Sequence, residues 1–179
     1  MQISLFRLAR YFSLAALCLI ITPAAFAQKD FALNVSVTTS EHSRDSNSTT
    51  KTFRVSANTL WYEETYQGAR ASRHPTIKKE YELTADDRVR LIELLKYKAL
   101  LRTKTIAKSA EPSGPSRDFE ISVTARLNGK GGLISIKAPR SAMELKTDSL
   151  YQGSVLLIAE LYRIINRSDP DITFDELIK

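Results

Sequence analysis

Alternation of apolar and polar residues constrains the fold of this chain more than any other feature. The segment 31–38, FALNVSVT, carries an apolar residue at every second position. A period of two places alternate side chains on opposite faces of a β-strand, so such a strand buries one face and leaves the other in water. The chain is therefore expected to build a sheet with one wet face.

The same reading predicts further strands, and local turn residues separate them. Asn58 supplies a turn after the second strand, and the pair Asn128-Gly129 predicts a tight hairpin. The strands are expected at 31–38, 53–57, 60–66, 77–83, 119–127 and 134–136.

Two segments with a helical apolar stripe are expected to cover that sheet. The helix at 85–101 begins after Thr84, which is typical of an N-cap, and acidic residues follow it. The helix at 149–166 begins with Ser149 and has Gln152 three residues later, the spacing of a capping box. Gly153 within it predicts close packing against the sheet.

Together these elements predict a single α+β domain in the order β-β-β-β-α-β-β-α. Its largely antiparallel sheet of about six strands is covered by the helices on one face. Residues 39–50 hold no Leu, Ile, Val or aromatic residue and are expected to form a polar loop, and 169–179 forms an acidic C-terminal tail. Residues expected in the core are Val35, Val55, Leu91, Leu95, Ile121, Val123, Ile134, Val155, Ile158 and Tyr162.

The first 27 residues have the features of a secretory signal peptide. Arg7 and Arg10 precede an apolar run at 11–21, and Ala25-Phe26-Ala27 is the small-x-small pattern of a cleavage site. The run is about half of the roughly 20 residues that cross a bilayer. We expect cleavage after Ala27, a domain at 28–179 with no transmembrane segment, and a periplasmic or secreted bacterial protein.

Cleavage would also remove the single cysteine, Cys18. Disulfides, thiolate nucleophiles and cysteine metal sites are then excluded from the domain. The formal charge of +6 falls to +4 because two arginines and no acidic residue leave. Outside the cytoplasm a basic protein meets acidic lipids and glycans, so nucleic acid is not an expected partner.

No set of residues has the pattern of a catalytic site. The two histidines, His42 and His74, have no Gly-x-Ser-x-Gly nucleophile near them. Glu80 and Glu82 share a face with Lys78, which favours a charge-balanced surface over a glycosidase pair. The acidic tail lacks the spacing of a calcium loop. We expect a non-catalytic protein without metal or cofactor, with a glycan hydrolase as the least favoured alternative.

Two groups of residues are candidates for binding. The first is a basic run without an acid between Glu93 and Glu111, which would attract anionic lipid or glycan. Its members are Lys96, Lys98, Arg102, Lys104 and Lys108. The second is the aromatic group Trp61, Tyr62 and Tyr66, of which either Trp61 or Tyr62 must point away from the core.

In element order alone, the segment from Ile77 to Ile165 resembles the secreted protease inhibitors of the emfourin type. That resemblance carries no residue across. It implies inhibition of a protease as an alternative function. The principal expectation is a binding module of the bacterial envelope that contacts an envelope component or a secreted protein.

Overall fold

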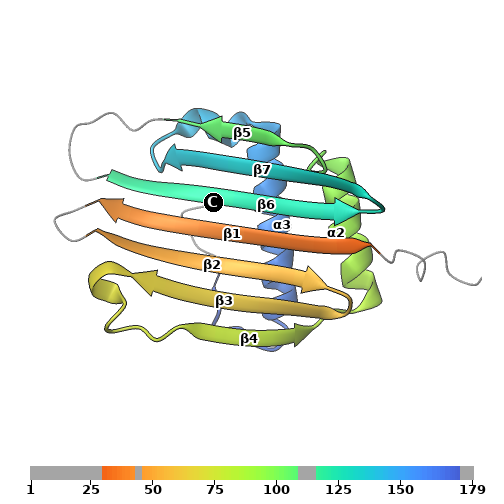
Figure 1. Ribbon diagram of the computed structural model, residues 1–179, viewed down its shortest axis with the longest axis horizontal. Helices are drawn as coiled ribbons and strands as arrows, with labels where there is room; N and C mark the ends of the chain where they lie inside the picture. Colours follow the sequence, from red (N-terminus) through yellow and green to blue (C-terminus); the bar gives the residue numbers. More distant parts are fainter. Residues whose placement is uncertain (1–29, 43–45, 109–115, 174–179) are drawn as a thin grey trace, which may run out of the picture.

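The computed structural model describes residues 30–42, 46–108 and 116–173, which form one α+β domain (Figure 1). The predicted signal peptide with Cys18 lies outside the described residues, as do 174–179 of the predicted tail.

Seven strands form one sheet in the order β4-β3-β2-β1-β6-β7-β5. All neighbouring strands are antiparallel except β5 and β7, which are parallel. The predicted fold class is confirmed. The strand bounds are β1 Phe31–His42, β2 Asn47–Ser56, β3 Thr59–Gln67, β4 Ile77–Glu82, β5 Lys104–Ala107, β6 Ser116–Leu127 and β7 Lys130–Pro139.

Strand β5 adds a seventh strand to the six expected. It lies at the edge of the sheet, where Lys104 is opposite Ile134 and Ile106 is opposite Ile136 of β7 (Figure 1). Only four residues long, it is too short to show alternation reliably.

The predicted polar loop at 39–50 is wrong for most of its length. Strand β1 continues to His42 and β2 begins at Asn47. Their hydroxyl-bearing side chains meet across the strands, with Thr38 Oγ1 and Thr50 Oγ1 3.0 Å apart. Backbone pairing does not require apolar side chains, and threonine favours strands. The lack of apolar residues at 39–50 is therefore compatible with two paired strands and does not indicate a loop.

Helices α2 (Ala85–Tyr97) and α3 (Ser149–Ile165) both lie behind the sheet in the view of Figure 1. Short 3-10 helices, η2 (Gly68–Arg70) and η3 (Met143–Thr147), connect other elements. Among the described residues, no helix has the length and apolar character needed to cross a bilayer.

The core fills the space between these helices and the sheet. Nine of the ten residues expected there are buried, and Val155 is half-buried. The nine are Val35, Val55, Leu91, Leu95, Ile121, Val123, Ile134, Ile158 and Tyr162.

The caps of the two helices differ in how well the sequence predicted them. Thr84 caps α2, where its hydroxyl accepts a hydrogen bond from Asp87 N at 3.2 Å. The prediction of a capping box formed by Ser149 and Gln152 is wrong. Asp148 caps α3 instead, and its side chain accepts a hydrogen bond from Leu150 N at 2.8 Å. A carboxylate at this position is also favoured by the helix dipole.

Gly153 packs closely, as expected, but against a different neighbour. A Cβ at Gly153 would lie 2.8 Å from Lys98 Cβ, in the segment that follows α2. The glycine therefore allows α3 to approach this connecting segment, not the sheet.

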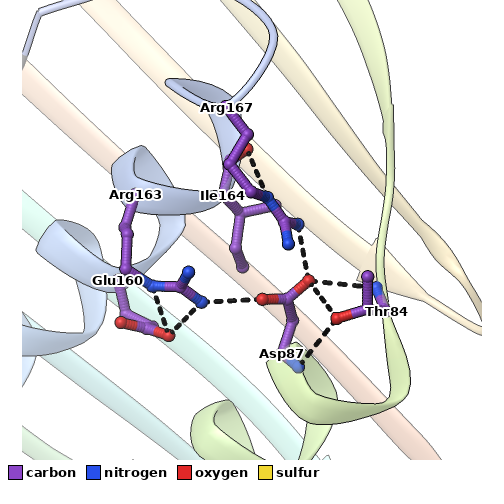
Figure 2. A network of polar contacts seen from close by, with 6 residues as sticks. All are labelled: Thr84, Asp87, Glu160, Arg163, Ile164 and Arg167. Carbon is purple, nitrogen blue, oxygen red and sulfur yellow. Dashed lines mark hydrogen bonds and ion pairs between the residues drawn. The ribbon is translucent and has the colours of Figure 1, made fainter.

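A buried carboxylate fastens the two helices together (Figure 2). Asp87 is 2% exposed, and its oxygens accept from Arg163 Nη2 at 2.7 Å and Arg167 Nη2 at 2.6 Å. Burial alone would raise the pKa of Asp87, but the bonds from Thr84, Arg167 and Arg163 outweigh it and lower that pKa to about 2. The carboxylate thus stays charged while it joins α2 to α3.

The first residue of the predicted acidic tail is bound to the sheet. Asp169 accepts a hydrogen bond from the hydroxyl of Tyr81 at 2.7 Å, and Lys79 Nζ lies 3.0 Å from its other oxygen. These contacts lower the pKa of Asp169, the bond from Tyr81 contributing most. The chain beyond α3 is therefore attached to the edge strand β4.

Candidate functional site

The structure divides the basic run predicted from sequence. Lys96 lies in the last turn of α2 and lines a hollow beside the β2–β3 turn. Lys98 Nζ lies 4.6 Å from the centre of the Tyr97 ring. The other three residues, Arg102, Lys104 and Lys108, line one groove, which we call the basic groove.

The path of the chain after α2 places these three residues. A Cβ at Gly132 of β7 would lie 2.4 Å from Arg102 N, so only glycine lets this segment pass so close to β7. The chain then enters β5, where Lys104 and Ile106 pair with the core-facing Ile134 and Ile136. Lys104 and Ile106 therefore project toward the helix side of the sheet.

The basic groove has a volume of about 560 Å³ and lies between β5 and the start of α3. Its apolar lining consists of Ile106, Leu145 and Leu150. Both leucines belong to the core, and Ile106 is half-buried against it. The basic side chains of the groove thus lie beside an apolar surface formed by these three residues, which we call its apolar floor.

The two acidic residues of the groove are already engaged. Glu144 Oε1 lies 3.5 Å from Lys108 Nζ. Asp148 accepts from Leu150 N and Tyr151 N at the start of α3, at 2.8 and 3.0 Å. Arg102 and Lys104 are exposed and, in the part of the chain that the structure describes, form no ion pair within 4.0 Å. Their charge is available to an anion.

The predicted aromatic group does not form one surface. Trp61 is 40% exposed on the open face of the sheet, whereas Tyr62 is 1% exposed and belongs to the core. One of the two points outward, as expected. Tyr66 lies on the helix-facing side, where its hydroxyl donates to Glu64 Oε1 at 2.8 Å and its ring stacks on His74.

Glu80 and Glu82, the carboxylates considered for catalysis, share the open face of the sheet with Lys78, which pairs with Glu63. Glu63 is 3.1 Å from Lys78 Nζ and 3.7 Å from Arg54 Nη2 on the open face. Glu80 and Glu82 are exposed on β4. This arrangement agrees with the charge-balanced surface that the alternation indicated.

Sequence reasoning missed the partners of the basic residues. Glu144, Leu145, Asp148 and Leu150 complete the basic groove from a segment far along the chain. The helix start near Ser149 was a usable signal, because a helix N-terminus favours anions. The packing of that start beside β5 could not be predicted, since β5 itself was not recognised.

Compared with models of known protein families, the chain matches none. No curated protein shows detectable sequence similarity to it.

Proposed function

We propose that this protein is an exported, non-catalytic binding protein of the bacterial envelope, and that the basic groove holds the anionic head group of a lipid. The observation that carries the proposal is the convergence of Arg102, Lys104 and Lys108 on one groove with an apolar floor. The predicted signal peptide supports export, and anionic lipids are available in that compartment.

An acidic lipid fits this groove better than an acidic glycan does. Ile106, Leu145 and Leu150 offer contact to the first methylenes of an acyl chain, and a polysaccharide has no such segment. Each cation close to an anionic membrane contributes about 1 kcal/mol at moderate salt. The two cations that the described residues leave unpaired, Arg102 and Lys104, therefore give weak, salt-dependent attachment, and the apolar floor must supply the remainder.

The experiment is co-sedimentation of the protein with phosphatidylglycerol vesicles and with phosphatidylcholine vesicles, each at low and high salt. We expect binding to the anionic vesicles only, with loss at high salt because exposed charges are screened within about 10 Å at 0.1 M. Lys104→Glu should weaken binding by about 30-fold, the equivalent of removing two favourable charges.

A matched control is Lys78→Glu, which makes the same charge change on β4 at the opposite edge of the sheet. It should bind like the unaltered protein. Equal weakening by both variants would mean that net charge alone drives binding, and the groove would have no special role. Preference for an acidic polysaccharide over the vesicles would identify a glycan ligand instead.

A protein partner on the open sheet face is the second candidate, and it includes protease inhibition. It is favoured by the exposure of Trp61, a residue type enriched at the centre of interfaces. This version predicts a stoichiometric complex that tolerates salt and that Trp61→Ala abolishes. If purified protein hydrolysed an envelope glycan and Glu82→Gln abolished turnover, the non-catalytic proposal would be wrong.

A further inference from the structure

A third hollow lies on the helix-facing side of the sheet, beyond the helices. In Figure 1 the strands β1, β2 and β6 extend well past α3 toward the β1–β2 connection. There they border a cleft of about 280 Å³, which we call the polar cleft. Its lining includes Thr39, Glu41, Thr49, Lys51, Glu64 and Tyr66.

The carboxylate of Glu64 is held by two tyrosines. Its oxygens accept hydrogen bonds from the hydroxyls of Tyr62 and Tyr66, at 2.6 and 2.8 Å. Burial, followed by the bond to Glu64, raises the pKa of Tyr66 to about 12, so this hydroxyl keeps its proton. The ring of Tyr66 is further fixed by stacking on His74, with 4.8 Å between ring centres.

The other two carboxylates at the cleft, Glu41 and Asp118, differ in their contacts. Glu41 holds two cations, with Arg70 Nη2 at 3.0 Å and Arg117 Nε at 3.3 Å. Asp118 Oδ2 lies 3.2 Å from His42 Nε2, whereas Asp118 Oδ1 is buried and has no hydrogen-bond partner among the described residues. Glu41 balances the charge of only one of the two arginines, and the N–H groups of both that it does not contact remain available for hydrogen bonding.

Lys51 is the remaining cation. It is half-buried and stands directly opposite Glu64 in the strand register, yet Glu64 is engaged by the tyrosines. Among the residues described, no carboxylate oxygen comes within 4.0 Å of its Nζ. Its ammonium lies 5.8 Å from the centre of the Tyr162 ring, a contact that does not neutralise its charge.

We propose that the polar cleft binds a small hydroxylated carboxylate, of the kind a uronic acid presents, with Lys51 as the partner of the ligand carboxylate. The cleft's volume suits one sugar ring, near the lower limit for small-ligand sites. Thr39 and Thr49 supply hydroxyls, and Tyr66 supplies an aromatic face, for the remainder of such a ring. This site is separate from the basic groove and does not depend on lipid binding.

Titration calorimetry with glucuronate, and with glucose as the uncharged counterpart, tests this proposal. We expect heat of binding with glucuronate and at least tenfold weaker binding of glucose, because a charge-assisted bond is lost. A uronic acid trisaccharide forms a further arm. Tighter binding of the trisaccharide would identify the end of an acidic glycan as the source, and equal binding would identify the free acid.

Lys51→Met keeps an unbranched side chain one atom shorter and removes its charge, so it should abolish the preference for glucuronate over glucose. Lys51→Gln serves the same purpose if the first variant unfolds below the assay temperature. Lys78→Met on β4 is the matched control and should keep that preference. The proposal is overturned if neither acid binds, if glucose binds equally, or if the Lys51 variants retain the preference.

Discussion

The two ends of the helix-facing side of the sheet differ in polarity although the same strands build both. On β1, Val35 and Val37 are buried beneath the helices, whereas Thr39 and Glu41 continue on the same face and border the polar cleft. On β3, Tyr62 in the core gives way to Glu64. We infer that the covered end provides stability and that the uncovered end is free to carry binding groups.

This difference has a simple physical origin. Apolar side chains are stabilised only where another layer removes them from water, at about 25 cal/mol per Å². On β1 beyond Val37 and on β2 before Phe53 the same alternation of side chains remains, but the residues facing the helix side are polar or charged. Strands β1 and β2 therefore continue beyond the hydrophobic core, because their pairing depends on backbone hydrogen bonds.

The largest expected effect comes from breaking the contact that holds α2 to α3 over the covered end. Asp87→Asn removes the charge that both Arg163 and Arg167 contact, and it should lower the free energy of unfolding by about 3 kcal/mol. Asp86→Asn, an exposed acid in the same first turn, should cost about 0.5 kcal/mol or less. Urea denaturation of both variants measures the difference, and equal losses would show that the buried network contributes nothing particular.

The same carboxylate predicts an acid dependence of stability. The pKa of Asp87 in the folded protein is about 2, below the ordinary value of 3.8. A lowered pKa stabilises the fold above the unfolded value and loses this contribution as pH falls through the folded one. The unaltered protein should therefore lose more stability than Asp87→Asn between about pH 4 and pH 2. Parallel acid titrations of the two proteins would contradict the assignment.

A smaller effect distinguishes the two ends along one strand. Val35→Thr places a hydroxyl in the core and should cost about 2 kcal/mol, because that hydroxyl has lost water without a designed partner. Thr39→Val makes the reverse exchange on the same face, four residues further along β1, and should change stability by about 0.5 kcal/mol or less. Thermal unfolding of the pair measures both effects. Equal costs at the two positions would mean that the polar cleft is packed as tightly as the core.

Sequence reasoning recovered the covered end well and the uncovered end poorly. Alternation and helical stripes identify Val123 and Ile158 as core because burial leaves a periodic pattern of apolar residues. Polar residues in a strand leave no such pattern, so the continuations of β1 and β2 through Thr39 and Thr49 were assigned to a loop.

The basic groove shows a related limit. Arg102, Lys104 and Lys108 were identified from charge alone, but Leu145 and Leu150 meet them only through the tertiary packing of α3 beside β5. The clustering of charge in the sequence thus identified the basic residues of the groove but not its apolar lining. That lining depends on contacts between segments far apart in the chain.

Lipid binding at the basic groove is tested most directly by amide chemical-shift mapping of isotope-labelled protein during titration with a soluble, short-chain phosphatidylglycerol. We expect salt-sensitive shifts concentrated at residues 102–108 and 143–150, which border the basic groove. Lys104→Glu should remove these shifts. Shifts centred on Trp61 and the open face of the sheet, or no shifts at the groove at saturating lipid, would contradict this proposal.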